Sequence, residues 1–239
     1  MRIDKLLSNM GYGSRKEVKK HLKGGGTIVN GEVVKDAKFQ VDPEKDTVTV
    51  HGEEVVYKEF VYLMMNKPPG VLSATEDAEG ETVIDLLEME DQIFNPFPVG
   101  RLDKDTEGLL LITNDGQLSH QLLSPKKHVP KTYFAVIDGE VTEEDVTAFA
   151  KGVTLDDGYE TKPGELEIIS SGLRSEIQLT ITEGKFHQVK RMFEAVGKRV
   201  IYLKRMLMGP LPLDETLELG EYRELTEEEV EELKNFKIE

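Results

Sequence analysis

The sequence of 239 residues contains no cysteine, which excludes disulfide bonds, thiolate metal ligands and cysteine nucleophiles. It also lacks any apolar run approaching the ~20 residues that a membrane-spanning helix needs. The first residues are polar and charged, without the apolar core of a signal peptide. Hydrophobic residues nevertheless make up 38% of the chain, which is enough for a packed core. We therefore expect a folded, cytoplasmic protein that acts as a monomer.

Motifs for metals and cofactors are missing as well. The five histidines do not have the spacing of a metal site. The glycines at Gly152, Gly158 and Gly164 are scattered and do not form a dinucleotide-binding fingerprint. The sequence therefore predicts no metal ion and no nucleotide cofactor.

The charge of the chain is strongly negative but unevenly distributed. A net charge of −16 and a pI near 4.8 would by themselves argue against a nucleic-acid-binding protein. Residues 214–239 alone carry eleven acidic side chains against three basic ones. Two segments, 1–23 and 185–205, are locally basic. Because binding depends on where charge is placed, these two segments are candidate binding surfaces on an acidic body.

Residues 1–58 are expected to form a small module of two helices and a β-hairpin. Apolar residues recur with helical spacing over 2–10, and Ser14 with Glu17 gives a capping box for a second helix over 15–23. Three glycines at 24–26 end that helix. Asn30-Gly31 between β-branched residues predicts a tight hairpin turn, and a further strand is expected over 47–50.

Basic side chains crowd the helical part of this module. Lysines and arginines on one face of a short helix suit phosphate binding, but most runs of charge are simply a solvated helix face. Both interpretations remain open from the pattern. The candidate RNA-binding residues are Arg2, Lys5, Arg15, Lys16, Lys19, Lys20 and Lys23.

Residues 59–239 are expected to form a larger second domain. Strands are predicted over 60–65, 108–113, 132–137, 166–169, 175–182 and 200–207. Helices are predicted over 82–87, 117–123, 142–151, 187–196 and 226–236. Strands and helices alternate without a βαβ rhythm, which favours an α+β fold with a mixed, mainly antiparallel sheet flanked by helices.

The segment GRLDKDTEGLLLITNDG, residues 100–116, places Asp103 and Asp105 directly before an apolar strand. Both carboxylates could belong to a polar loop and pair with Arg101 and Lys104. A D-x-D pair could also bind a hard cation, although the chain has no phosphate-binding loop or further acidic cluster to support such a site. Alternatively, one carboxylate could act as a nucleophile, held rigid by the strand that follows.

The helix predicted from His187 begins with cationic side chains, Lys190 and Arg191. Positive charge near a helix amino terminus opposes the helix dipole. The pattern is compatible with an exposed basic face, or with a carboxylate or phosphate bound nearby.

Four ordered segments together resemble ribosomal RNA pseudouridine synthases, specifically the RsuA type. These segments are 66–70 (NKPPG), 100–116, 131–133 (KTY) and 183–193 (EGKFHQVKRMF). The amino-terminal module is similar to the S-four type RNA-binding domain, so the resemblance covers nearly the whole chain. One departure is the run of three glycines at 24–26, where related modules usually carry a bulkier or basic residue.

The resemblance implies a reaction and a set of site residues. Asp103 would be the nucleophile in the isomerisation of uridine to pseudouridine, attacking either the base or the ribose and needing no cofactor. Tyr133 would pack on the flipped-out base and take part in proton transfer, and Lys190 would pair with the catalytic carboxylate. Asp105 would be a loop residue. The implied RNA contacts in this domain are Arg101, Lys67, His187, Gln188 and Arg191.

The phrase HQVKRMFEAVG resembles enzymes that act on small-subunit 16S ribosomal RNA, free or in a partly assembled subunit. The same chemistry on 23S ribosomal RNA is the nearest alternative. Two further alternatives remain. One is a non-catalytic RNA-binding assembly factor of the same fold, and the other is a metal-dependent phosphoesterase that uses both aspartates.

Overall fold

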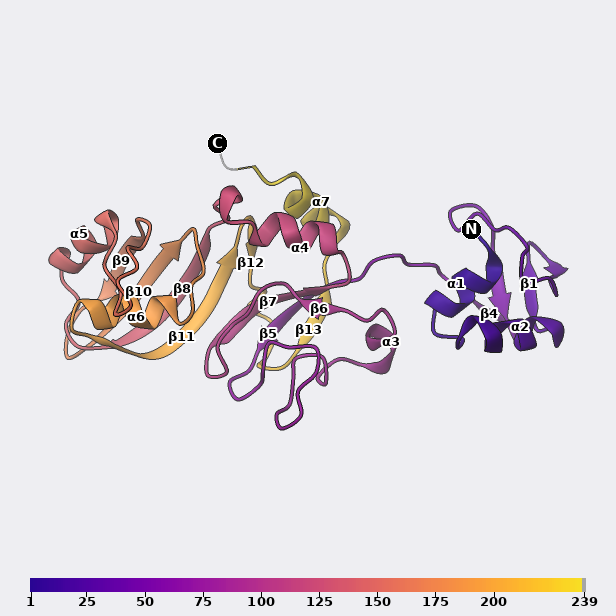
Figure 1. Cartoon of the computed structure of the whole chain (residues 1–239), viewed down its shortest axis with the longest axis horizontal. Coiled ribbons are helices and arrows are strands. Elements are labelled where there is room, and N and C mark those ends of the chain that lie inside the picture. Colours follow the sequence, from indigo (N-terminus) through magenta and orange to yellow (C-terminus); the bar gives the residue numbers. More distant parts are fainter. Residues whose placement is uncertain (238–239) are drawn as a thin grey trace. The chain divides into compact units, whose positions relative to one another are not determined.

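The computed structural model describes residues 1–237 and divides the chain into two compact units. The first comprises residues 1–61 and 88–96, and the second comprises residues 62–87 and 97–239, of which the last two are not described. Figure 1 gives the order of the elements along the chain. Each unit has its own core and is described separately below.

The first unit has three helices, α1 (Ile3–Asn9), α2 (Arg15–Lys23) and the short α3 (Met89–Gln92), of which α1 and α2 share a core with a small antiparallel sheet. Its strands, in the sheet order β2-β1-β3-β4, are β1 (Thr27–Val29), β2 (Glu32–Val33), β3 (Val48–Val50) and β4 (Glu53–Glu54). Ser14 and Glu17 form the predicted capping box at the start of α2. Asn30 and Gly31 both have positive φ, 51° and 86°, as the predicted hairpin turn requires. Leu6, Leu7, Val18 and Leu22 are buried in a shared core with the strands.

The second unit is built on a nine-stranded sheet. The strand order is β13-β5-β7-β11-β8-β10-β9, with β6 added to β7 and β12 added to β11. Among the strands of the described residues, every pairing is antiparallel except that of β7 with β11, which confirms the predicted mixed, mainly antiparallel α+β sheet. The strands are β5 (Tyr62–Lys67), β6 (Phe97–Pro98), β7 (Glu107–Thr113), β8 (Lys131–Asp138), β9 (Glu165–Ser170), β10 (Arg174–Ile181), β11 (Arg199–Met208), β12 (Leu211–Pro212) and β13 (Tyr222–Glu224).

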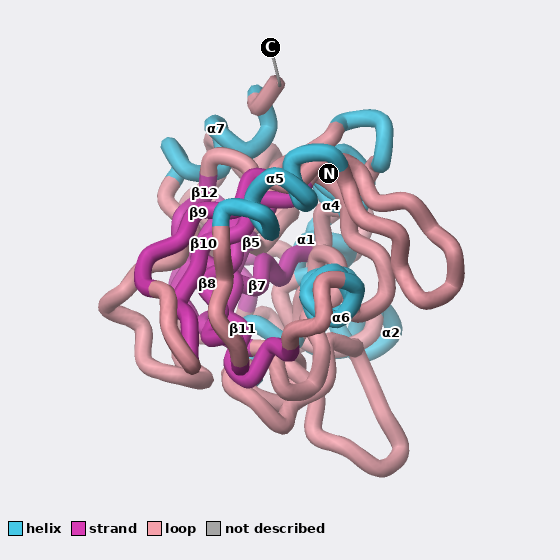
Figure 2. Tube along the Cα trace, turned by 90° about the vertical axis from the view of Figure 1, so that its left-hand side faces the viewer, coloured by secondary structure: helices cyan, strands magenta, loops and turns pink. Residues whose placement is uncertain are grey.

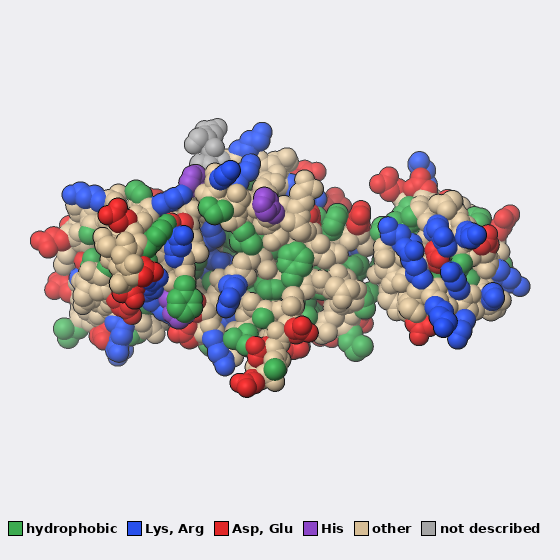
Figure 3. All heavy atoms as spheres, viewed as in Figure 1, with side chains coloured by type: hydrophobic (Ala, Val, Ile, Leu, Met, Phe, Trp, Pro, Cys, Tyr) green, Lys and Arg blue, Asp and Glu red, His purple; other side chains and the backbone are tan. Residues whose placement is uncertain are grey.

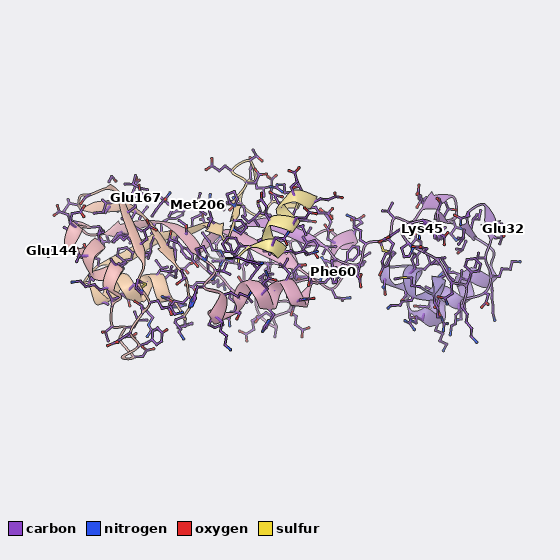
Figure 4. The ribbon with its side chains drawn as sticks, turned by 90° about the horizontal axis from the view of Figure 1, so that it is seen from above. Glu32, Lys45, Phe60, Glu144, Glu167 and Met206 are labelled. Atoms are coloured by element: carbon purple, nitrogen blue, oxygen red, sulfur yellow. The ribbon has the colours of Figure 1, made fainter. Side chains whose placement is uncertain are left out.

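Helices cover the two halves of this sheet (Figures 1 and 2). They are α4 (Gly116–Leu123), the 3-10 turn η1 (Pro125–Lys127), α5 (Glu143–Lys151), α6 (Gln188–Ala195) and α7 (Glu227–Asn235). Leu118 of α4 and Leu233 of α7 enter the same core as Met64 of β5. In the other half, Phe149 of α5 meets Phe193 of α6 with ring centroids 4.9 Å apart. Figure 4 shows Glu144 of α5 and Glu167 of β9 at the outer end of the sheet.

The prediction of a helix over 82–87 is wrong. The backbone on either side of Thr82 pairs with Leu72, through Leu72 N–H to Glu81 at 2.9 Å and Val83 N–H to Leu72 at 2.9 Å. The Asp85 carboxylate also accepts hydrogen bonds from the backbone and hydroxyl of Thr82. These bonds hold the segment in consecutive turns, because polar side chains compete with the helix for backbone partners. The remaining predicted helices and strands are present, with ends shifted by a few residues.

The close pairing of β7 with β11 depends on a glycine. Gly108 lies opposite Arg205 with φ 101°, and a Cβ added to it would lie 2.3 Å from the carbonyl oxygen of Arg205. Only glycine allows this approach and this conformation. Gly108, which follows the two aspartates, therefore allows β7 to pair with β11 in the interior of the sheet. The loop that carries the aspartates is thereby connected directly to a central strand.

Candidate active site

The loop that precedes β7 carries Asp103 and is held by hydrogen bonds from several elements. Thr106 N–H donates to the Asp103 carbonyl at 3.1 Å, and Gly70 N–H donates to that of Lys104 at 2.7 Å. The Ser73 hydroxyl donates to the Leu102 carbonyl at 3.0 Å and accepts from the Leu102 N–H at 3.1 Å. A loop tied at four backbone positions gives its side chains a fixed direction, as a nucleophile requires.

Lys67, at the end of β5, holds this loop through hydrogen bonds to its backbone carbonyls. Its ammonium lies 3.2, 3.3 and 3.0 Å from the carbonyl oxygens of Asp103, Lys104 and Thr106, and 2.9 Å from that of Pro68. The side chain has no exposed surface, and burial lowers the pKa of Lys67 to about 8 despite the nearby acidic side chains of Asp105 and Asp103. The structure does not support RNA binding by Lys67, because its ammonium is enclosed by protein carbonyls.

The Asp103 carboxylate meets two basic side chains from the start of α6. Lys190 Nζ lies 3.2 Å from Asp103 Oδ2, and His187 Nε2 lies 3.5 Å from Asp103 Oδ1. Lys190 also donates to Asp105 Oδ1 at 2.6 Å. Burial disfavours the ammonium of Lys190, but hydrogen bonds to Asp105 and Asp103 outweigh it and raise the pKa of Lys190. Lys190 therefore remains charged and holds both carboxylates.

The two aspartates differ in exposure and in environment. The Asp103 side chain is 25% exposed and that of Asp105 is 74% exposed. The hydrogen bond from Lys190 lowers the pKa of the Asp105 carboxyl. An ammonium thus occupies the position between the carboxylates where a D-x-D site would hold its metal ion. Among the described residues, there is no group of three or more histidine, aspartate or glutamate side chains that could bind a metal.

Asp103 opens onto a cleft of about 880 Å³ within the second unit. Its lining includes Arg101, Tyr133 and His187 from three separate segments. Tyr133 is 8% exposed, so its ring forms part of the cleft wall. The cleft thus combines a held carboxylate, an aromatic face and basic groups at its rim, which suits a flat ring attached to a phosphate chain.

Other predicted RNA contacts in this unit have partners within the protein. Gln188 is buried, donates to Glu183 at 2.8 Å and accepts from the backbone N–H of Lys185. Arg191 forms ion pairs with Asp156 and Asp157. These two side chains organise the start of α6 rather than presenting free donors. Arg101 is exposed, and the exposed ring of Phe186 stacks on His187 with centroids 3.8 Å apart.

The predicted basic residues of the first unit lie mostly on α2. Arg15, Lys16, Lys19, Lys20 and Lys23 are exposed, whereas Val18 and Leu22 of the same helix are buried. Figure 3 shows lysine and arginine side chains gathered on one face of this unit. Arg2 is engaged with Asp4 at 2.7 Å. The helix therefore presents its cations on the side opposite to its core.

Two cleft residues were not singled out from the sequence. Arg205 of β11 and Lys131 of β8 line the cleft wall. Lys131 belongs to the KTY segment at 131–133, and Arg205 ends the basic segment 185–205, so both lie in segments that the sequence already indicated as functional. Their position beside the site could not be inferred from spacing, because it depends on how β8 and β11 pair.

Comparison with known proteins identifies the fold and its chemistry. Residues 61–195 match the RNA pseudouridylate synthase family, and residues 1–48 match the S4 domain. The chain belongs to the RNA pseudouridylate synthase family. The uncharacterized RNA pseudouridine synthase YtzG of Bacillus subtilis is 59% identical over 231 residues, which are 96% of this chain and 97% of the relative. The ribosomal small subunit pseudouridine synthase A of Escherichia coli is 41% identical over 232 residues, covering 96% and 98% of the two chains.

A solved structure agrees with this assignment. A crystal structure of a pseudouridylate synthase superposes with a TM-score of 0.69 at 38% identity and covers 98% of this chain and 99% of its own. The protein is thus an RNA pseudouridine synthase with an amino-terminal S4 domain. Over residues 1–237, no helix has both the length and the apolar character needed to cross a membrane.

Proposed function

We propose that this pseudouridine synthase converts one uridine of 16S ribosomal RNA to pseudouridine, with Asp103 as the nucleophile. The observation that supports the nucleophile best is the Asp103 carboxylate, held by Lys190 at 3.2 Å and facing a cleft that Tyr133 also lines. Support for 16S ribosomal RNA comes from relatives at 41% identity that are named small subunit pseudouridine synthases.

In the proposed reaction the target uridine leaves its stack in the RNA and enters the cleft. Extrusion of a base costs a few kcal/mol, of which stacking on an aromatic ring such as Tyr133 returns about 1–3 kcal/mol. The base is detached from its sugar, turned, and rejoined through carbon 5. The ion pair with Lys190, 3.2 Å from Asp103 Oδ2, holds the direction of the attacking carboxylate.

RNA outside the cleft is proposed to contact basic residues on both units. Arg101 would hold a phosphate near the target, or fill the space that the base leaves. In the S4 domain, the exposed lysines and arginine of α2 would bind phosphates on one rigid face, with Lys5 and Arg2 of the neighbouring helix start contributing less specifically.

The decisive experiment uses unmodified 16S ribosomal RNA, both free and as a partly assembled particle, in buffer containing EDTA. Carbodiimide treatment followed by primer extension locates any pseudouridine. We expect one new stop that is absent with Asp103→Asn, although this variant should bind RNA with nearly unchanged affinity. A stop found only in 23S ribosomal RNA would support the same reaction on a different substrate. Loss of activity in EDTA would instead favour a metal-dependent reaction.

A second variant tests the role of the aromatic side chain. Tyr133→Phe keeps the ring but removes the hydroxyl. If that oxygen transfers a proton, the variant should bind RNA normally and form product much more slowly. Full activity would limit Tyr133 to stacking.

A further inference from the structure

Arg205 of β11 is an unusually buried cation for which the arrangement around Asp103 gives no role. Its side chain is 2% exposed and lines the cleft. Nε donates to the Leu109 carbonyl at 2.8 Å, but Nη2 is buried without any hydrogen-bond partner. Buried polar groups in native proteins almost always have a partner, so Nη2 is a donor beside the cleft whose hydrogen bond the protein does not supply.

A second cation, half-buried, lies on the neighbouring strand. Lys131 of β8 lines the same cleft and donates to the Val129 carbonyl at 3.1 Å. Within the described residues, neither Lys131 nor Arg205 forms an ion pair with a carboxylate. Burial, together with the charge of Arg205, lowers the pKa of Lys131 to about 8. A buried cation beside a half-buried one, with no carboxylate to compensate either, is costly unless a ligand with negative charge or strong acceptors joins them.

Both cations lie next to Tyr133 on one face of the sheet. Arg205 is directly opposite Tyr133 in the antiparallel pairing of β11 with β8. Side chains at opposed positions are neighbours on the same face. Lys131 precedes Tyr133 by two positions on the same strand, so it too points to this face. A ring stacked on Tyr133 would therefore present its edge to Arg205 and Lys131.

We propose that Arg205 and Lys131 form a receptor for the carbonyl edge of the target uracil and stabilise the negative charge that this base acquires during isomerisation. This inference rests on the proposed function, since it places uracil on Tyr133. The site takes a planar heterocycle with carbonyl acceptors rather than a phosphate. A phosphate of the RNA chain stays near the exposed rim, where Arg101 and Lys104 lie, whereas an extruded nucleotide inserts its base first.

The base becomes anionic by either route that is open to Asp103. Attack of the carboxylate on C1′ breaks the C1′–N1 bond and leaves its electron pair on the base, shared among N1, O2 and O4. Addition of the carboxylate to C6 moves the electron pair of the C5–C6 bond onto O4. On the first route C5 then bonds to C1′, and the Asp103 carboxylate leaves with the electron pair of its bond to C1′. On the second route the C1′–N1 bond breaks with its electron pair left on N1, C5 bonds to C1′, and the carboxylate leaves C6 as C5 gives up its proton. On both routes C5 loses a proton and N1 gains one, which returns the base to neutral. Cations fixed beside the carbonyl oxygens stabilise the charged state more than the neutral base.

The first test compares Arg205→Met, Arg205→Lys and wild type in single-turnover reactions on RNA tritiated at C5 of uridine, since isomerisation releases that hydrogen. We expect Arg205→Met to be slower by about 100-fold or more and Arg205→Lys to recover part of the rate. RNA affinity, measured with Asp103→Asn also present, should change less than about threefold. Arg199→Met is the matched control, because Arg199 lies on the same strand with a 72% exposed side chain.

The second test begins with wild type, so its first comparison does not depend on folding of a variant. The substrates are RNAs with 4-thiouridine or 2-thiouridine at the target position, in which sulfur replaces O4 or O2 of the base. Each analogue weakens one hydrogen-bond acceptor, because sulfur accepts hydrogen bonds poorly. Wild type should turn over at least one of these substrates about tenfold more slowly, and Arg205→Met should show a smaller penalty. Unchanged wild-type rates with both substrates, or an active Arg205→Met, would overturn the receptor while leaving pseudouridine formation intact. Wild type without product on any RNA would instead overturn the proposed function itself.

Discussion

Lys190 Nζ lies 3.2 Å from the Oδ2 atom of Asp103, although Asp103 comes from the loop before β7 and Lys190 from α6. The same ammonium reaches Asp105 at 2.6 Å. One lysine thus fixes the direction of two carboxylates, of which the less exposed faces the cleft. Because each aspartate receives only part of the lysine's donors, the ion pair directs Asp103 without using all of its acceptor positions.

Removal of this lysine should impair chemistry far more than binding. We expect Lys190→Met to lower the single-turnover rate by about 100-fold or more, because Asp103 loses its cation and its fixed direction. Lys190→Arg should retain part of the rate. Asp105→Asn is the control for the shared ion pair and should cost less than about tenfold. A Lys190→Met enzyme within threefold of wild type would contradict this role.

Lys67 should prove to be a structural residue of the loop that carries Asp103. Lys67→Met keeps a similar volume but withdraws the ammonium from four backbone carbonyls. Leaving such acceptors unpaired should lower the free energy of unfolding by about 1–3 kcal/mol and reduce activity as the loop loosens. Urea unfolding followed by circular dichroism measures the change. Lys104→Met, an exposed position in the same loop, should have the stability of wild type.

The effect of Lys67 on stability should depend on pH. Its pKa is about 8 in the folded protein and 10.5 without burial, so between these values the unfolded chain binds more protons than the native one. Stability from this group therefore rises with pH across the window from about 8 to 10.5, and below pH 8 its burial penalty is constant. We expect the difference in unfolding free energy between wild type and Lys67→Met to grow by about 1–3 kcal/mol from pH 7 to pH 10. A difference that shrinks with pH would mean that the folded pKa is not lowered.

The basic face of α2 should determine the salt dependence of RNA binding. Reversing the charge with Lys16→Glu and Lys20→Glu should weaken binding and flatten the slope of log affinity against log salt by about 0.7–0.9 for each phosphate that the helix no longer neutralises. Lys38→Glu, at an exposed position outside the helix, changes the net charge of the unit without altering that face. Equal effects of the reversals at Lys16 and Lys38 would show that only total charge matters.

Local sequence was sufficient for most of the elements but not for every one. The capping box at Ser14, the Asn30-Gly31 turn and the acidic helix before Phe236 follow from interactions among residues close in the chain. The failed helix at 82–87 shows the limit. Its pattern was helical, but pairing with Leu72 and the Thr82–Asp85 hydrogen bonds took the backbone groups that a helix would use.

What the sequence alone determined is the order of elements, the family resemblance and the residue types available for chemistry, since these reside in short ordered segments. Only the tertiary structure decided which side chains meet. It enclosed Lys67 among carbonyls, directed Lys190 to both aspartates, and placed Arg205 opposite Tyr133 without a partner for Nη2. These contacts join residues distant in the chain through the pairing of β5, β7, β11 and β8, and no local preference specifies them. Their chemical consequences, burial of charge and unpaired donors, exist only once the sheet has formed.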